Sequence, residues 1–194
     1  MASQRPPKPY YATKNAHPDL SVLSGGVAVV TGSANGIGYS LAEAALAHGL
    51  HVALADVDSV GLTLAEEQLR AKATGSVEVF SHVTDVSSEA SVRSLAAAVA
   101  EHFNGIRVSL LCCNAGIGGG GIIASPDAEW QRTFGVNVFG VAHCLRAFVP
   151  AMLAHKAPGA VVTTSSQDGI CASQGIYGAS KHACVALSEG LYQE

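Results

Sequence analysis

The chain has 194 residues, of which 48% are hydrophobic and 13% are charged, and its formal net charge is −4. This composition is typical of one globular domain and excludes a disordered chain. Because no basic stripe is visible, we expect neither nucleic acid nor an anionic membrane surface as the main partner.

The cysteines are odd in number and have no C-x-x-C spacing; they stand at positions 112, 113, 144, 171 and 184. This usage is typical of reduced thiols in an intracellular protein, so we expect a cytoplasmic location. The eight histidines are scattered, and no Cys/His cluster predicts a metal site. The longest apolar region, 136–157, is interrupted by polar residues and Pro150, so the sequence predicts no transmembrane span.

Residues 1–24 contain four of the seven prolines and little apolar periodicity. We predict a mobile tail over these residues and one domain over residues 25–194. A transit peptide is the alternative, because no acidic residue precedes Asp19, although Arg5 is the only arginine of the tail.

From residue 27 onward, short apolar runs alternate with helical patterns. Strands are predicted at 27–30, 51–55, 77–80, 108–112 and 160–164, and helices at 36–48, 60–72, 88–103, 126–134, 138–155 and from 177 onward. Strands that are apolar throughout imply a parallel sheet covered by helices on both faces. The predicted fold class is therefore α/β, with a doubly wound parallel sheet in a single domain and ligands beyond the carboxyl ends of the strands. The last helical pattern reaches Glu194 without a stop signal, which predicts that the chain is cut short.

The segment Thr31–Gly38 reads T-G-S-A-N-G-I-G and connects the first predicted strand to its helix. Glycines let a backbone turn tightly and approach a pyrophosphate, and a helix N-terminus offers free N–H groups to it. Asp56 follows the second strand, 18 residues after Gly38, where a carboxylate can accept hydrogen bonds from a ribose. The pattern predicts a dinucleotide phosphate site; an ordinary glycine-rich turn is the alternative.

A second glycine cluster follows the fourth strand, where Gly116, Gly118 and Gly121 spell G-x-G-x-x-G. No helix begins at Gly121, and twenty residues further on stands Val141 rather than an acid. We therefore predict that residues 118–121 form a loose rim rather than a phosphate loop, and that Asn114 ties the fourth strand to its neighbours.

Five motifs stand in a fixed order along the chain. They are the glycine motif Thr31–Gly38, the N-A-G of Asn114–Gly116, Asn137 in the following helix, a serine in Thr164–Ser166, and the Y-x-x-x-K pair Tyr177 and Lys181. Together they resemble the classical short-chain dehydrogenases/reductases. The resemblance covers residues 25–194 and implies a Rossmann-like sheet that lacks the family's C-terminal strands, its proline–glycine segment and its substrate loop.

The resemblance implies NAD as the cofactor. Asp56 matches the position that favours NAD over NADP, because a carboxylate would repel a 2′-phosphate. Asp85 matches the contact to the adenine amino group, and a helix-capping role is its alternative. The implied cofactor-binding residues are Gly32, Ser33, Asn35, Gly36, Ile37, Gly38, Asp56, Asp85, Val86, Asn114, Ala115, Gly116, Tyr177 and Lys181.

Tyr177 and Lys181 are four residues apart and share one face of a helix. A neighbouring ammonium favours a phenolate, so the pair can act as a general acid and base. By the resemblance, Lys181 also holds the nicotinamide ribose, a serine polarises the substrate oxygen, and Asn137 orders a proton-relay water. Ser166 fits the S-x-x-G form of the catalytic serine better than Ser165, although only 11 positions separate it from Tyr177.

The implied function is an oxidoreductase, with NAD preferred, that interconverts a secondary alcohol and a ketone by hydride transfer. The resemblance also implies a homodimer or homotetramer for the full-length protein, built on helix 138–155 and the Tyr177 helix; an ordinary core helix is the alternative. A truncated, non-catalytic NAD-binding or oligomerising protein is the competing function. An epimerase or lyase on the same fold is a third.

Overall fold

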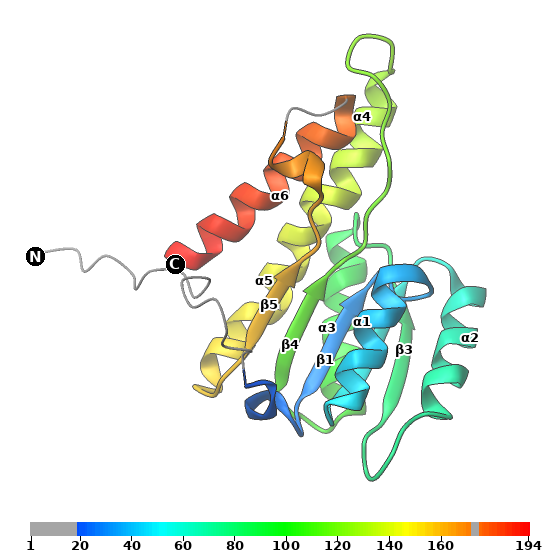
Figure 1. The fold of residues 1–194 in the computed structure, drawn as a ribbon, viewed down its shortest axis with the longest axis vertical. Helices are drawn as coiled ribbons and strands as arrows, with labels where there is room; N and C mark the ends of the chain where they lie inside the picture. The colour runs from blue at the N-terminus through cyan, green and yellow to red at the C-terminus, as the bar shows by residue number, and fades with distance from the viewer. Residues whose placement is uncertain (1–18, 172–174) are drawn as a thin grey trace, which may run out of the picture.

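The computed structural model describes residues 19–171 and 175–194. Five parallel strands form one sheet in the order β3-β2-β1-β4-β5 (Figure 1). The strands are β1 (Val27–Thr31), β2 (His51–Asp56), β3 (Val79–Val83), β4 (Val108–Cys113) and β5 (Ala160–Thr163). The order reverses between β1 and β4, so a ligand crevice is expected at the carboxyl ends of these two strands. The predicted doubly wound α/β fold is confirmed.

Helices cover both faces of the sheet (Figure 1). They are α1 (Gly36–Ala47), α2 (Ser59–Arg70), α3 (Glu89–His102), α4 (Asp127–Phe134), α5 (Gly140–Ala154) and α6 (Gly175–Gln193). Strand side chains alternate between faces. Accordingly, Ala28 and Val30 of β1 share a core with α1 and α2, whereas Val27 and Val29 share one with α3 and α5. Each face of β1 is therefore buried under a helical layer.

Strand β3 lies further along the chain than the sequence predicts, over Val79–Val83 instead of 77–80. It is an edge strand that pairs only with β2. Its second half contains Ser81 and His82, which are partly exposed. An edge strand tolerates polar residues, so a search for continuous apolar runs ends too early.

The two helices predicted before and after residue 136 form one continuous helix, Asp127–Ala154. The π-helical turn η3 (Gly135–Phe139) joins α4 to α5. Among the described residues this is the one helix long and apolar enough to cross a membrane by length and composition. Core helices of soluble proteins meet the same criterion, and Val141, Cys144 and Phe148 are buried in the core shared with α3. The absence of a transmembrane span stays a prediction.

The ordered domain begins before residue 25. Leu20–Leu23 form the short 3-10 helix η2, and Leu23 is buried. The Ser109 hydroxyl donates a 2.9 Å hydrogen bond to the Leu23 carbonyl, and Arg107 donates one of 3.0 Å to the Val22 carbonyl. The predicted boundary at residue 24 is therefore wrong. The sequence gives no local sign of these contacts, because Arg107 and Ser109 lie more than 80 positions further along the chain. Residues 1–18 of the predicted tail lie outside the described residues.

Candidate active site

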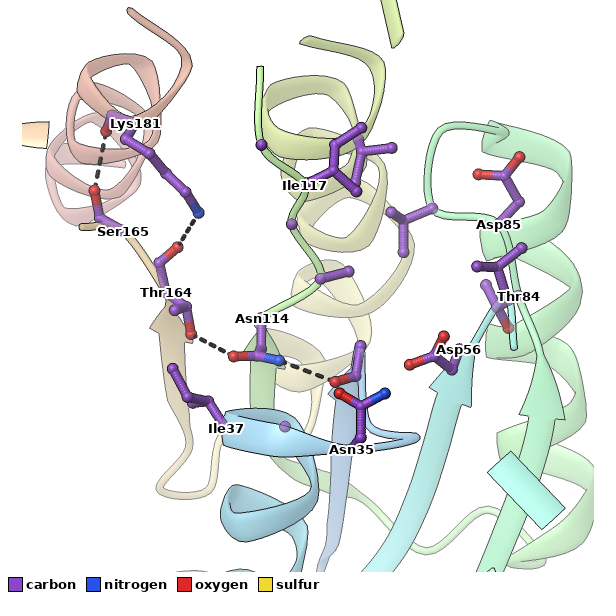
Figure 2. Close-up of a pocket in the computed structure, with 18 of the residues that line it drawn as sticks. Asn35, Ile37, Asp56, Thr84, Asp85, Asn114, Ile117, Thr164, Ser165 and Lys181 are labelled. Carbon is purple, nitrogen blue, oxygen red and sulfur yellow. Dashed lines mark hydrogen bonds between the residues drawn. The ribbon is translucent and has the colours of Figure 1, made fainter. Parts of the chain in front are cut away.

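A cleft of about 510 Å³ opens where all five strands end (Figure 2). Residues that follow β1, β2, β3, β4 and β5 form most of its wall, and η3 and α6 complete it. The lining residues are Gly32, Asn35, Ile37, Gly38, Asp56, Val57, Thr84, Asp85, Val86, Asn114, Ala115, Gly116, Ile117, Gly118, Val136, Thr164, Ser165, Tyr177 and Lys181. Most of the predicted cofactor-binding residues therefore share one cavity.

The turn between β1 and α1 needs its glycines for two different reasons. Gly32 and Gly36 have φ values of +66° and +56°, which a side chain disfavours. A Cβ at Gly38 would overlap the Gly32 carbonyl oxygen and lie 2.7 Å from the Asn114 side-chain nitrogen. The N-cap residue Asn35 makes no side-chain hydrogen bond to α1, so the first N–H groups of this helix are free for an anion. These features fit a pyrophosphate.

Two carboxylates stand on the opposite side of the cleft from Lys181 (Figure 2). The Asp56 oxygens accept 3.0 Å hydrogen bonds from the backbone N–H groups of Ala34 and Asp58, which fixes the carboxylate at the end of β2. Asp85 accepts bonds from the N–H and hydroxyl of Ser87. The N-cap of α3 is Ser88, so the capping alternative for Asp85 is wrong.

Asn114 links the ends of three strands, as predicted. Its Nδ2 donates to the carbonyls of Thr31, at 3.0 Å, and Gly32, at 3.2 Å. Its Oδ1 accepts a 3.0 Å hydrogen bond from the Thr164 hydroxyl, which follows β5 (Figure 2). Asn114 thereby holds the glycine turn beside Thr164, which directly precedes the two candidate serines.

Lys181 is buried, with 4% of its surface exposed, yet it lines the cleft. Its ammonium nitrogen donates a 2.9 Å bond to the Thr164 carbonyl and lies 5.7 Å from the centroid of the Tyr177 ring. An ammonium has three N–H donors. Within the described part of the chain Thr164 is its one acceptor, so two donors are left for a ligand in the cleft.

The two adjacent serines have different roles. Ser165 lines the cleft, and its hydroxyl donates a 3.0 Å bond to the Lys181 carbonyl. Ser166 does not line the cleft; its oxygen accepts a 3.1 Å bond from the Asp168 N–H and begins the 3-10 helix η4 (Gln167–Gly169). The structure therefore places Ser165, rather than the predicted Ser166, on the cleft wall. The Ser166 proton, however, has no acceptor among the described residues, whereas that of Ser165 is in use.

Asn137 lies behind the cleft wall in η3 and is 1% exposed. Its side chain exchanges two bonds with the backbone of Ile117, of 2.8 and 2.9 Å, and donates a third, of 2.9 Å, to the Ser180 hydroxyl. Its carbonyl accepts a 2.9 Å bond from the Cys184 thiol, whose pKa is raised by burial. Asn137 therefore ties the loop after β4 to α6, and both of its amide hydrogens are in use.

Some residues lie elsewhere than predicted, and others were missed. Ser33 is fully buried, and its oxygen accepts a 2.9 Å bond from the Ala55 N–H, so it supports the turn without lining the cleft. The cleft residues that the sequence prediction lacks are Val57, Thr84, Ile117, Gly118, Val136, Thr164 and Ser165. Their positions in the sequence could have identified them, since most of them directly follow a strand or a predicted site residue.

Known proteins match this chain over the residues that build the cleft. The family model for short chain dehydrogenases matches residues 26–194. Short chain aldehyde dehydrogenase 1 of Euphorbia lathyris is 33% identical over 188 residues, and the match covers 91% of this chain and 61% of that protein. The chain thus spans about three-fifths of the length of this curated relative.

Two solved structures show the same fold. A short-chain dehydrogenase/reductase of Burkholderia phymatum in complex with NAD is 44% identical, with a TM-score of 0.82, and the match covers 88% of this chain and 60% of that one. A metagenomic short-chain oxidoreductase in complex with NADP is 33% identical, with a TM-score of 0.79, and the match covers 88% and 76%. With the family model matching almost the whole described domain, the chain belongs to the short-chain dehydrogenase family.

Proposed function

We propose that this chain contains the cofactor-binding and acid–base part of an oxidoreductase that prefers NAD and interconverts a secondary alcohol and a ketone. The observation that carries the proposal is the single cleft that contains the uncapped start of α1, the Asp56 carboxylate, and the Tyr177–Lys181 pair. The start of α1 can bind a phosphate, Asp56 can bind a ribose, and the Tyr177–Lys181 pair can transfer a proton. The match to dehydrogenases with bound dinucleotides supports the same reading.

The cofactor is expected to extend across the cleft from Asp56 to Lys181. The turn over 36–38 would receive the pyrophosphate, Asp56 the adenosine ribose, and Lys181 the nicotinamide ribose. When bound, a nicotinamide dinucleotide supplies the hydride acceptor or donor. Lys181 is the one cation among the lining residues, so no positive charge near Asp56 would offset its repulsion of a 2′-phosphate. This supports a preference for NAD.

Tyr177 is the proposed general base for alcohol oxidation and the general acid for ketone reduction. The Lys181 ammonium nitrogen lies 5.7 Å from the ring centroid, so a cation stands beside the group proposed to exchange the proton. The proposed donor to the substrate oxygen remains Ser166, as the family resemblance implies. Ser166 does not line the cleft, but its proton has no acceptor among the described residues, whereas the Ser165 proton is held by the Lys181 carbonyl. Asn137 holds the loop after β4 against α6 and so positions these groups.

We further propose that the full-length protein is a homo-oligomer. An apolar groove of about 700 Å³ lies between α5 and α6, and it is lined by residues such as Leu145, Val149, Leu153 and Leu187. Leu153 is 72% exposed. A second copy of these two helices would cover this face, which otherwise places large apolar side chains in water.

The test is an absorbance assay of NAD reduction at about 340 nm with a panel of secondary alcohols, together with NADH binding. We expect turnover by the intact protein, no turnover by Tyr177→Phe, and retained NADH binding by both, because the variant lacks only the phenolic hydroxyl. Unchanged turnover by Tyr177→Phe contradicts the mechanism. NADH binding without turnover in the intact protein would instead favour a non-catalytic binding role.

A further inference from the structure

The glycine run 118–121 makes specific contacts with α6. The Gly120 carbonyl accepts a 2.9 Å hydrogen bond from the N–H of Ile176 in the first turn of that helix. A Cβ at Gly119 would lie 3.0 Å from the Thr133 hydroxyl oxygen and 3.2 Å from the Ile176 Cβ. The predicted loose rim is therefore wrong at these two positions, because the loop is packed against α4 and α6.

The loop over residues 118–121 lies so close to the start of α6 that an added side chain would collide at one of the contact positions. Gly175 has a φ of +60°, and a Cβ on it would overlap the Gly120 carbonyl and lie 3.2 Å from the Gly121 Cα. By contrast, a Cβ at Gly121 itself would meet no atom within 4 Å. The run thus contains two positions where a side chain would be crowded, Gly119 and Gly120, and two where it would meet open space, Gly118 and Gly121.

The contact falls next to the proposed catalytic residue. The first N–H groups of a helix have no partner within the helix, and the Ile176 side chain is completely buried. Gly120 supplies the partner that this N–H needs. Tyr177 is the next residue, so the same contact sets where the phenol enters the cleft.

Lys181 is held by different groups. Its ammonium bonds to the Thr164 carbonyl, and its own carbonyl accepts the Ser165 hydroxyl bond. A change in the glycine run should therefore displace Tyr177 more than Lys181. This separation distinguishes an effect on acid–base chemistry from an effect on cofactor binding.

We infer that Gly119 and Gly120 are positioning residues that dock the start of α6 and thereby place Tyr177. The inference rests on the proposed function for its consequence in catalysis, but the docking itself is independent of activity. In Gly119→Ala, the added methyl group would press on Thr133 and Ile176 and weaken the Gly120–Ile176 bond. In Gly121→Ala, the matched control, the methyl group would occupy open space.

The deciding measurement is amide hydrogen exchange of the cofactor-free chain by NMR. We expect the Ile176 N–H to exchange at least roughly tenfold faster in Gly119→Ala, within twofold of the wild-type rate in Gly121→Ala, and the Cys184 N–H to be unchanged in both. Equal effects of the two variants, no effect of Gly119→Ala, or faster exchange along the whole chain would each overturn the inference.

A second variant and a kinetic readout complete the test. Thr133→Ser added to Gly119→Ala removes the methyl group that the new Cβ meets at 3.1 Å, so Ile176 protection should partly return. In the active full-length protein, Gly119→Ala should lower kcat by roughly ten- to a hundredfold with KM for NAD unchanged. If the protein has no turnover at all, the proposed function fails while the exchange data still decide the docking role. A lower NADH affinity with unchanged kcat would contradict the separation of Tyr177 from Lys181.

Discussion

The Lys181 ammonium nitrogen lies 5.7 Å from the centroid of the Tyr177 ring, with both side chains on the wall of one cleft. Because Lys181 is buried and keeps two donors free, its charge acts on whatever enters that cleft. Replacing Lys181 with Met keeps most of the volume and removes the charge. We expect turnover to fall at least about a thousandfold and NADH to bind more weakly, as measured by steady-state kinetics and calorimetry.

The control for this variant is Lys72→Met. Lys72 forms an exposed ion pair with Glu43, at 2.6 Å, on the outer surface of α1 and the end of α2. We expect unchanged kinetics and little change in the free energy of unfolding, because solvent screens an exposed ion pair. Equal losses from Lys181→Met and Lys72→Met would show that the buried charge has no special role.

The two serines give a second prediction. Ser166→Ala should lower kcat roughly a hundredfold with little change in NADH affinity, because Ser166 has the free proton. Ser165→Ala should act mainly on stability, since it removes the 3.0 Å bond to the Lys181 carbonyl. A larger kcat loss in Ser165→Ala, with unfolding in urea unchanged, would assign the catalytic role to the serine on the cleft wall.

A third prediction concerns the choice between dinucleotides. The Asp56 carboxylate is fixed by two backbone N–H groups at the end of β2. We expect the wild type to bind NADH at least about tenfold more tightly than NADPH, and Asp56→Asn to reduce that ratio, because the substitution removes a like charge from the 2′-phosphate site. Calorimetric titration with each dinucleotide measures both ratios. An unchanged ratio in Asp56→Asn would refute the role assigned to this carboxylate.

A fourth prediction is about stability. Asn137→Ala removes three buried side-chain hydrogen bonds and leaves the Ile117 N–H and carbonyl without these partners. We expect the free energy of unfolding in urea to fall by about 2–4 kcal/mol. Asn35→Ala is the matched control, because the Asn35 side chain makes no cap bond to α1. If Asn137→Ala lowers the free energy of unfolding by less than about 0.5 kcal/mol, Asn137 does not hold the loop after β4 against α6.

Local sequence patterns were sufficient to predict the sheet and the side of the cleft that contains the β1 turn, Asn114 and Asp56. Continuous apolar runs identify buried parallel strands, and the β1 turn needs glycines for reasons that a short segment already contains. Asn114 and Asp56 could be predicted for the same reason, since each stands at the carboxyl end of a strand. Strand β3 was misplaced because its polar second half lies at the sheet edge.

Long-range packing was not visible in the sequence. The partners of Gly119 are Thr133 and Ile176, the second of them 57 positions away, so the glycine run gave no sign of being packed. The buried role of Asn137 likewise depends on Ser180, 43 positions away. The choice between Ser165 and Ser166 depends on which hydroxyl the α6 backbone engages, and no local pattern encodes that contact.

The central claim, that the cleft binds a nicotinamide dinucleotide through the β1 turn, is tested most directly by titrating NADH into the wild type, Gly36→Ala and Gly119→Ala. Neither residue lines the cleft, but an alanine at Gly36 must adopt the strained φ of +56° in the turn at the start of α1, whereas Gly119 lies outside that turn. We predict that the dissociation constant rises at least about tenfold in Gly36→Ala and stays within about twofold in Gly119→Ala. No saturable binding by the wild type, or a greater loss in Gly119→Ala than in Gly36→Ala, would contradict the claim.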